Sequence, residues 1–178
     1  EVQLLRDARA YREAYTLQGK LVKATPDNDD LEYELAMLAD KLGRHDEMER
    51  LLRKVIARNP NYHHALNALG YSLADRGVQL EEARLLIERA LSLAPNDPFI
   101  TDSLGWIEYR MGNMPQARQL LERAYRLRPD AEIAAHLGEV LWVLGEKEAA
   151  RKLWKESARL NADNEVLRET LKRLGVKP

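Results

Sequence analysis

The histidines are the side chains of this 178-residue chain most suited to metal or acid–base chemistry. They are His45, His63, His64 and His136, and no two of them have the spacing that places two metal ligands on one helix face. His63 and His64 are adjacent, and adjacent helical side chains diverge by about 100° and do not face each other. The chain has no cysteine, which excludes thiolate ligands, a cysteine nucleophile and disulfides. The sequence therefore predicts no metal, no cofactor and no enzymatic activity.

Other chemistry finds little support in the composition. The sequence contains no glycine-rich phosphate-binding loop, and its carboxylates are spread along segments that we expect to form exposed helix faces. The formal net charge is −1, so a nucleic-acid partner is not indicated. Charged residues make up 32% of the chain, and no stretch is long and apolar enough to span a membrane. Binding of a protein or peptide partner is the function class that remains.

The elements that would position a binding surface follow from a repeat. Pro26, Pro60, Pro95 and Pro129 are 34, 35 and 34 residues apart. A fixed period of this length is typical of a solenoid built from pairs of helices. The sequence predicts an all-α fold in which each unit is a helix-turn-helix.

The clearest unit runs from Pro98 to Pro129. It carries Leu104-Gly105 in its first helix, Gly112 at the turn and Ala117 in its second helix. This pattern resembles the tetratricopeptide repeat (TPR) family. The resemblance covers nearly the whole chain and implies a right-handed superhelical solenoid. The expected division is a partial repeat over 1–28, repeats over 29–62, 63–97, 98–130 and 131–163, and a C-terminal capping helix over 164–178.

The small residues of the repeat have a packing reason. Gly70, Gly105 and Gly138 let the two helices of a unit approach closely, and a larger side chain there would overpack the contact. We expect these glycines, and Trp154 in a second helix, to belong to the core. The segment before Pro26 matches only the second half of a unit, so we expect the chain to be part of a longer protein.

The first helices of such a solenoid line a concave groove, and the residues pointing away from the second helices can be read from the repeat. Seven of the eleven aromatic residues fall there, with Tyr62 at the edge. Exposed aromatic side chains among polar groups are typical of binding hot spots. The alternative is that Trp106 and Trp142 pack between neighbouring repeats. The predicted partner-binding residues are Tyr33, His64, Asn67, Tyr71, Phe99, Asp102, Trp106, Tyr109, Arg110, Glu139 and Trp142.

Within this set we expect Tyr71, Trp106 and Tyr109 to anchor a partner segment. We expect Arg110, Asn67 and Asp102 to orient it. TPR co-chaperones hold a C-terminal carboxylate with basic and amide side chains at particular first-helix positions. The corresponding positions here are Met37, Tyr71, Trp106 and Glu139, so a carboxylate clamp is not expected.

Some longer segments resemble the C-terminal half of bacterial outer-membrane TPR lipoproteins. They are NPNYHHALNALGYSLADRG, LAPNDPFITDSLGWIEYRMGN and AAHLGEVLWVLGEKEAARKLWKESARL. This resemblance implies a periplasmic adaptor that binds a carboxyl-terminal processing protease and brings it cell-wall hydrolase substrates. The lipidated cysteine of those relatives is not in this chain, so it implies an outer-membrane anchor only for a longer parent protein.

Two readings of different class remain open. The first is the scaffold or adaptor, with no chemistry of its own. The second is the recognition or assembly module of a larger envelope polysaccharide-export protein or enzyme. Self-association is also compatible with the half repeat before Pro26.

Overall fold

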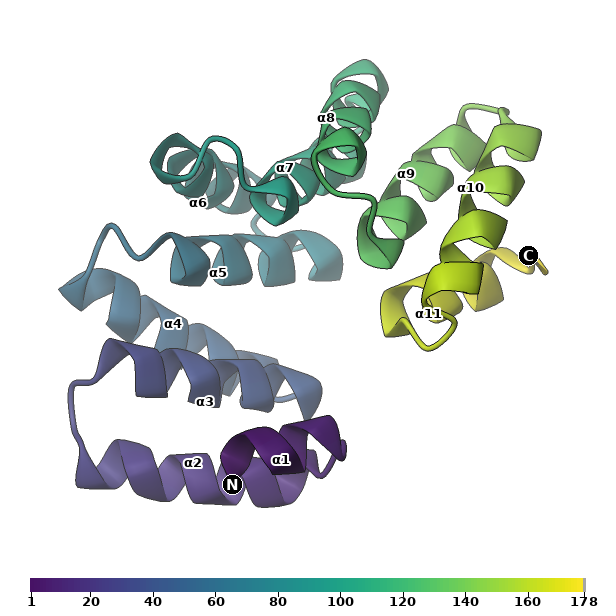
Figure 1. The fold of residues 1–178 in the computed structure, drawn as a ribbon. Helices are drawn as coiled ribbons and strands as arrows, with labels where there is room; N and C mark the ends of the chain where they lie inside the picture. The colour runs from purple at the N-terminus through teal and green to yellow at the C-terminus, as the bar shows by residue number, and fades with distance from the viewer. Residues whose placement is uncertain (178) are drawn as a thin grey trace.

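The structure is a computed structural model that describes residues 1–177. Every regular element in this range is an α-helix, and the predicted all-α solenoid of helix-turn-helix repeats is confirmed (Figure 1). In chain order the helices are α1 (Val2–Asp7), α2 (Tyr11–Ala24), α3 (Asp29–Lys41), α4 (His45–Arg58), α5 (His63–Arg76), α6 (Leu80–Leu93), α7 (Pro98–Arg110), α8 (Met114–Leu127), α9 (Ala131–Val143), α10 (Lys147–Leu160) and α11 (Glu165–Leu174).

Four of the helices begin at a side-chain cap. Asn28, Asp97, Asp130 and Asn164 accept hydrogen bonds from backbone N–H groups in the first turns of α3, α7, α9 and α11. A cap of this kind stabilises a helix by about 1 kcal/mol. Asn164 follows Asp130 at the repeat spacing, so α11 starts in the phase of a first helix. The sequence pattern predicts only a capping helix for this segment.

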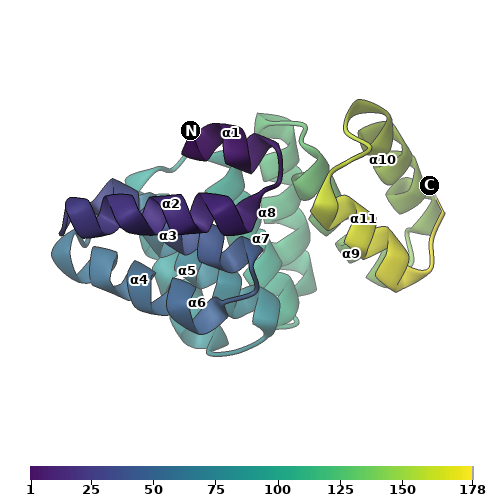
Figure 2. The same ribbon diagram turned by 90° about the horizontal axis from the view of Figure 1, so that it is seen from below.

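The helices pack mainly with their neighbours in sequence. α3 packs with α4, α5 with α6, α7 with α8 and α9 with α10, and each second helix also contacts the first helix that follows it, up to α9. Figure 2 shows that α9, α10 and α11 stand beside the rest of the array; α9 packs mainly on α8 and also contacts α7. None of the helices over residues 1–177 combines the length and the apolar character that crossing a membrane requires.

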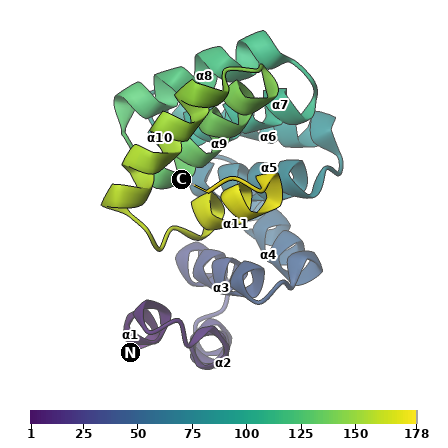
Figure 3. The same ribbon diagram turned by 90° about the vertical axis from the view of Figure 1, so that its right-hand side faces the viewer.

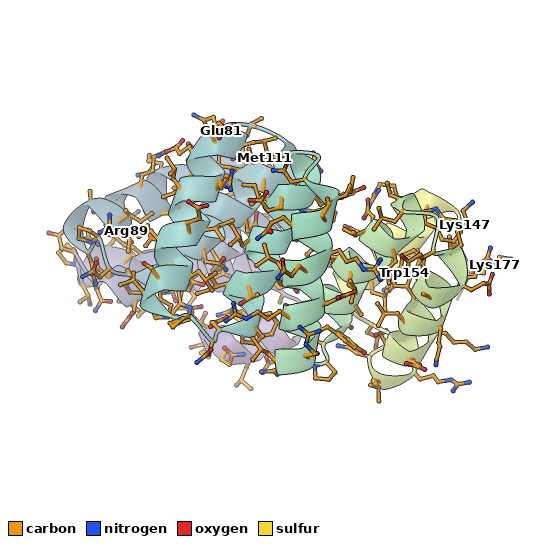
Figure 4. All side chains as sticks on the ribbon, turned by 90° about the horizontal axis from the view of Figure 1, so that it is seen from above. Glu81, Arg89, Met111, Lys147, Trp154 and Lys177 are labelled. Carbon is orange, nitrogen blue, oxygen red and sulfur yellow. The ribbon has the colours of Figure 1, made fainter. Side chains whose placement is uncertain are left out.

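Close approach at three glycines fixes the distance between paired helices. A Cβ at Gly70 would lie 2.6 Å from Ile87 Cγ1, and one at Gly105 would lie 2.7 Å from Leu121 Cγ. At Gly138 it would overlap the indole of Trp154, which is fully buried against α9 (Figure 4). The expected core role of these glycines and of Trp154 agrees with these contacts.

We predict that Gly138→Ala lowers the free energy of unfolding by about 1–3 kcal/mol, because the rigid indole of Trp154 has to move. The measurement is the urea midpoint of the variant against the wild type. Gly19→Ala is the matched control, since a Cβ at Gly19 in α2 meets nothing within 4 Å. This second change should stabilise the helix by about 0.5–1 kcal/mol. Equal midpoints for the two variants would contradict the packing argument.

Candidate functional site

A cavity of about 600 Å³ lies on the face formed by the first helices. Its lining comes from α5, α7, α9 and α11, together with Met114 at the start of α8. Figures 1 and 3 place α11 next to α9, on the side that faces the N-terminal helices. We call this cavity the first-helix pocket. It is lined by Tyr71, Asp75, Trp106, Tyr109, Arg110, Met114, His136, Glu139, Val166, Glu169, Thr170 and Arg173.

The floor of the pocket is a polar network that joins three first helices. The Nδ1 atom of His136 lies 2.8 and 3.0 Å from the two carboxylate oxygens of Asp102, and its Nε2 atom lies 3.3 Å from the Tyr71 hydroxyl. The indole of Trp106 stacks on the imidazole, with 4.3 Å between ring centroids. His136 and Asp102 are 1% and 2% exposed, so the network is shielded from water.

The charges around His136 favour its protonated form. Burial by itself lowers the pKa of His136, but the charge and hydrogen bond of Asp102, with Glu132 and Asp75 nearby, raise it above its ordinary value. Burial raises the pKa of Glu132. Burial also raises the pKa of Tyr71 far above its usual range, and surrounding carboxylates add to this shift. An activated nucleophile needs a lowered pKa, so the Tyr71 hydroxyl is suited to hydrogen bonding rather than to attack on a substrate.

A second buried carboxylate ties α11 to the wall of the pocket. Glu139 is 2% exposed, and it accepts hydrogen bonds from Arg173 at 2.9 Å and from the Tyr109 hydroxyl at 3.1 Å. Burial and the charge of Glu139 raise the pKa of Tyr109 to about 12. At the other end of α11, the Lys41 ammonium of α3 lies 3.2 Å from the carboxylate of Glu165. The C-terminal helix therefore closes one side of the pocket.

A tetratricopeptide repeat family profile matches residues 33–98 and 103–165. The chain belongs to the tetratricopeptide repeat family. Proteins of this family are generally protein–protein interaction scaffolds, and the TPR fold is typically non-catalytic.

The relatives of this TPR chain include longer proteins. It is 45% identical over 153 residues to the TPR repeat-containing protein PA4667 of Pseudomonas aeruginosa, and the match covers 86% of this chain and 26% of PA4667. It is 28% identical over 172 residues to human protein O-mannosyl-transferase TMTC1, covering 92% of this chain and 19% of that protein. The chain thus spans about a quarter or less of the length of these two relatives.

A solved structure supports the same fold. The crystal structure of a thermophilic TPR protein from Thermus thermophilus superposes with a TM-score of 0.84 at 22% identity, covering 98% of this chain and 96% of that one. MamA from Desulfovibrio magneticus superposes with a TM-score of 0.69 at 18% identity, covering 92% of this chain and 93% of that one. At these identities the likeness shows the fold alone.

The TPR array brings five of the sequence-predicted binding residues together in the first-helix pocket, namely Tyr71, Trp106, Tyr109, Arg110 and Glu139. Two expectations need correction. Trp106 is only 4% exposed, because it is covered by His136 and Tyr109, so it packs between repeats as the alternative proposed. Asp102 and Glu139 are also buried, because each already has a partner inside the protein.

The other predicted residues lie outside this pocket. Tyr33 packs near His64 in α5, with 6.3 Å between their ring centroids, towards the N-terminal end of the array. Phe99 is 37% exposed beneath the guanidinium of Arg128. Trp142 packs on the core residue Trp154 at 5.8 Å. The Oδ1 atom of Asn67, one turn before Tyr71, is buried and has no hydrogen-bond partner within residues 1–177.

Sequence reasoning missed His136 and the contribution of α11. The repeat phase contained the signal, because Glu169 and Arg173 follow Ala135 and Glu139 by 34 residues. His136 directly follows the groove position Ala135 in α9, and the sequence indicated no role for it beyond that of a possible metal ligand. In the described part of the chain, no group of three or more His, Asp or Glu side chains could hold a metal ion.

We predict that the protein is more stable at pH 6 than at pH 9. The raised pKa of His136 gives stability that is complete below its ordinary value of 6.5 and is lost as the pH rises through the folded-state pKa. The raised pKa of Glu132 has the same sign, but its window begins at the ordinary value of 4.5, so the test between pH 6 and pH 9 rests on His136. Urea midpoints at the two pH values measure the difference.

The control removes both members of the buried pair. His136→Gln/Asp102→Asn should lose most of the pH dependence, because no charge then remains in the network. The single variant His136→Gln leaves Asp102 buried without a counter-charge and should cost about 3–5 kcal/mol. A double variant with an unchanged pH profile would contradict this assignment.

Proposed function

We propose that this TPR array is a non-catalytic adaptor that holds a segment of a partner protein in the first-helix pocket. One observation carries the proposal: a cavity of about 600 Å³ at the meeting point of four helices, with aromatic rings and polar groups in its lining. The buried Nε1–H of Trp106 has no acceptor within residues 1–177. Burial of the rings of Tyr71 and Tyr109 against a partner segment would supply apolar contact, and a partner carbonyl would reach the buried Trp106 donor once the side chains over it move aside.

The remaining predicted residues fit a longer path for the partner. Asn67 and Tyr71 lie one turn apart on α5, and Asn67 Oδ1 would accept a hydrogen bond from a main-chain N–H of the segment. Tyr33 and His64 would extend contact towards the N-terminal helices, and Phe99 and Trp142 would extend it along α7 and α9. The pocket is the centre of this surface because it is the part that is hollowed and lined by four helices.

We further propose that the whole protein works at the periplasmic face of a bacterial outer membrane. The support is the resemblance of the segments quoted above to lipid-anchored TPR adaptors, together with the 45% identity to a Pseudomonas aeruginosa TPR protein. In this proposal the partners are a carboxyl-terminal processing protease and the cell-wall hydrolases that it degrades.

The second candidate is a recognition module within a larger enzyme or export protein. The observation that favours it is the 28% identity to a protein named as an O-mannosyl-transferase, of which this chain matches 19%. The sequence outside the 178 residues discriminates between the two. A lipid-attachment motif supports the adaptor, and a catalytic domain supports the module.

Site-specific photo-crosslinking tests the adaptor proposal in the full-length protein. We predict that a benzophenone amino acid at Asp75, on the pocket rim, crosslinks to the processing protease or to a cell-wall hydrolase. The same group at Glu81 or Arg89 of α6, labelled in Figure 4, should give at least about tenfold less product, because neither residue lines the pocket. Position-specific contact is expected because only the rim site touches a segment held in the pocket.

The test avoids Trp106→Ala, since loss of this buried ring is expected to cost about 3–5 kcal/mol and to confound binding with stability. Crosslinks to the protease from Glu81 but not from Asp75 would place the interface elsewhere and overturn the proposal.

A further inference from the structure

The charges around the first-helix pocket do not balance. The two buried carboxylates are compensated inside the protein, Asp102 by His136 and Glu139 by Arg173. Asp75 and Glu169 are exposed, line the pocket, and form no ion pair or side-chain hydrogen bond within residues 1–177. They come from α5 and α11, so the uncompensated negative charge belongs to two different helices of the wall.

The lining holds two arginines, and one of them already has a partner. Arg173 bonds to Glu139 through both of its terminal nitrogens. The guanidinium of Arg110 lies over the C-terminal end of α5, where its Nη2 atom would be 2.7 Å from a Cβ built on Gly77. The carbonyl groups at a helix C-terminus carry partial negative charge and attract such a cation. Neither arginine forms an ion pair with Asp75 or Glu169 among the described residues.

A second, independent observation also indicates a ligand. Trp106 lines the pocket but is only 4% exposed. Its indole N–H has no acceptor in the part of the chain that the structure describes. A buried donor without a partner costs about 1–3 kcal/mol. The nitrogen is itself buried, so an acceptor oxygen from a bound segment would remove this cost once the side chains over it move aside.

We infer that the pocket takes a basic side chain, lysine or arginine, from the partner segment. The inference rests on the proposed function and names the chemistry of its ligand. The cationic head ion-pairs with Asp75 and Glu169, and its aliphatic stem packs on the rings of Tyr71 and Tyr109. The Trp106 N–H donates to a main-chain carbonyl oxygen of the same segment.

The opposite ligand chemistry does not fit the pocket. An acidic side chain or a C-terminal carboxylate would meet Asp75 and Glu169 at the rim. Like charges in a partly desolvated site repel, and a mismatch of this kind costs several kcal/mol. A neutral segment would bury the two rim carboxylates without a counter-charge. A basic residue is the ligand that satisfies both carboxylates.

Selection from a random peptide library tests the inference. Twelve-residue peptides displayed on phage are selected on the wild-type chain and on Asp75→Asn/Glu169→Gln. We predict that peptides enriched on the wild type carry lysine or arginine at a fixed position, and that this preference is lost on the variant. The matched control is Glu81→Gln/Glu156→Gln, which removes the same charge from exposed carboxylates outside the pocket and should keep the preference.

An enriched peptide then gives the size of the effect. Replacing its basic residue by norleucine should weaken binding to the wild type at least about tenfold and change binding to Asp75→Asn/Glu169→Gln by less than about twofold. Enriched peptides without a basic residue, or an equal norleucine effect on both proteins, would overturn the inference and leave the adaptor proposal standing. The absence of any peptide whose binding responds to Tyr109→Ala would instead count against the adaptor proposal itself.

Discussion

The close approach of paired helices at Gly70, Gly105 and Gly138 is the constraint on which the rest of the structure depends. Because no side chain separates the helices there, Ile87, Leu121 and Trp154 can fill the contact. One face of each of these first helices therefore packs on the second helix of its unit, and the opposite face does not. Because this contact repeats at a nearly constant period, the opposite faces of successive first helices lie side by side. The first-helix pocket lies where α5, α7, α9 and α11 meet.

The polar network of the pocket also depends on the repeat period. Asp102 and His136 are 34 residues apart, and so are Glu139 and Arg173. Each pair therefore joins two neighbouring first helices across one period of the repeat. A buried charge pair is a weak source of net stability, but breaking one is costly. The two pairs thus restrict how far neighbouring repeats can turn relative to each other, and so they hold the shape of the pocket.

The fold was predictable from the sequence because glycine, alanine and proline recur at fixed offsets in each unit. The groove face was partly predictable for the same reason, and it gave Tyr71, Tyr109 and Arg110. The burial of Trp106 could not be read from one repeat, because it depends on His136 in the next. Contacts between Tyr71 and His136, 65 residues apart, and between Lys41 and Glu165, 124 apart, depend on the curvature of the whole array.

The Tyr71, His136 and Asp102 side chains have the order of a nucleophile, a base and an orienting acid, yet their environment opposes catalysis. The imidazole is covered by the Trp106 ring, and burial raises the pKa of the Tyr71 hydroxyl, so neither group is prepared for proton transfer to a substrate. Such a network is better suited to a rigid floor. The floor is closed to solvent and its charges are paired, whereas Asp75 and Glu169 on the rim are exposed and unpaired within residues 1–177. Discrimination between partner segments is therefore expected to depend on the rim, where substitutions change charge without disturbing the packing of the repeats.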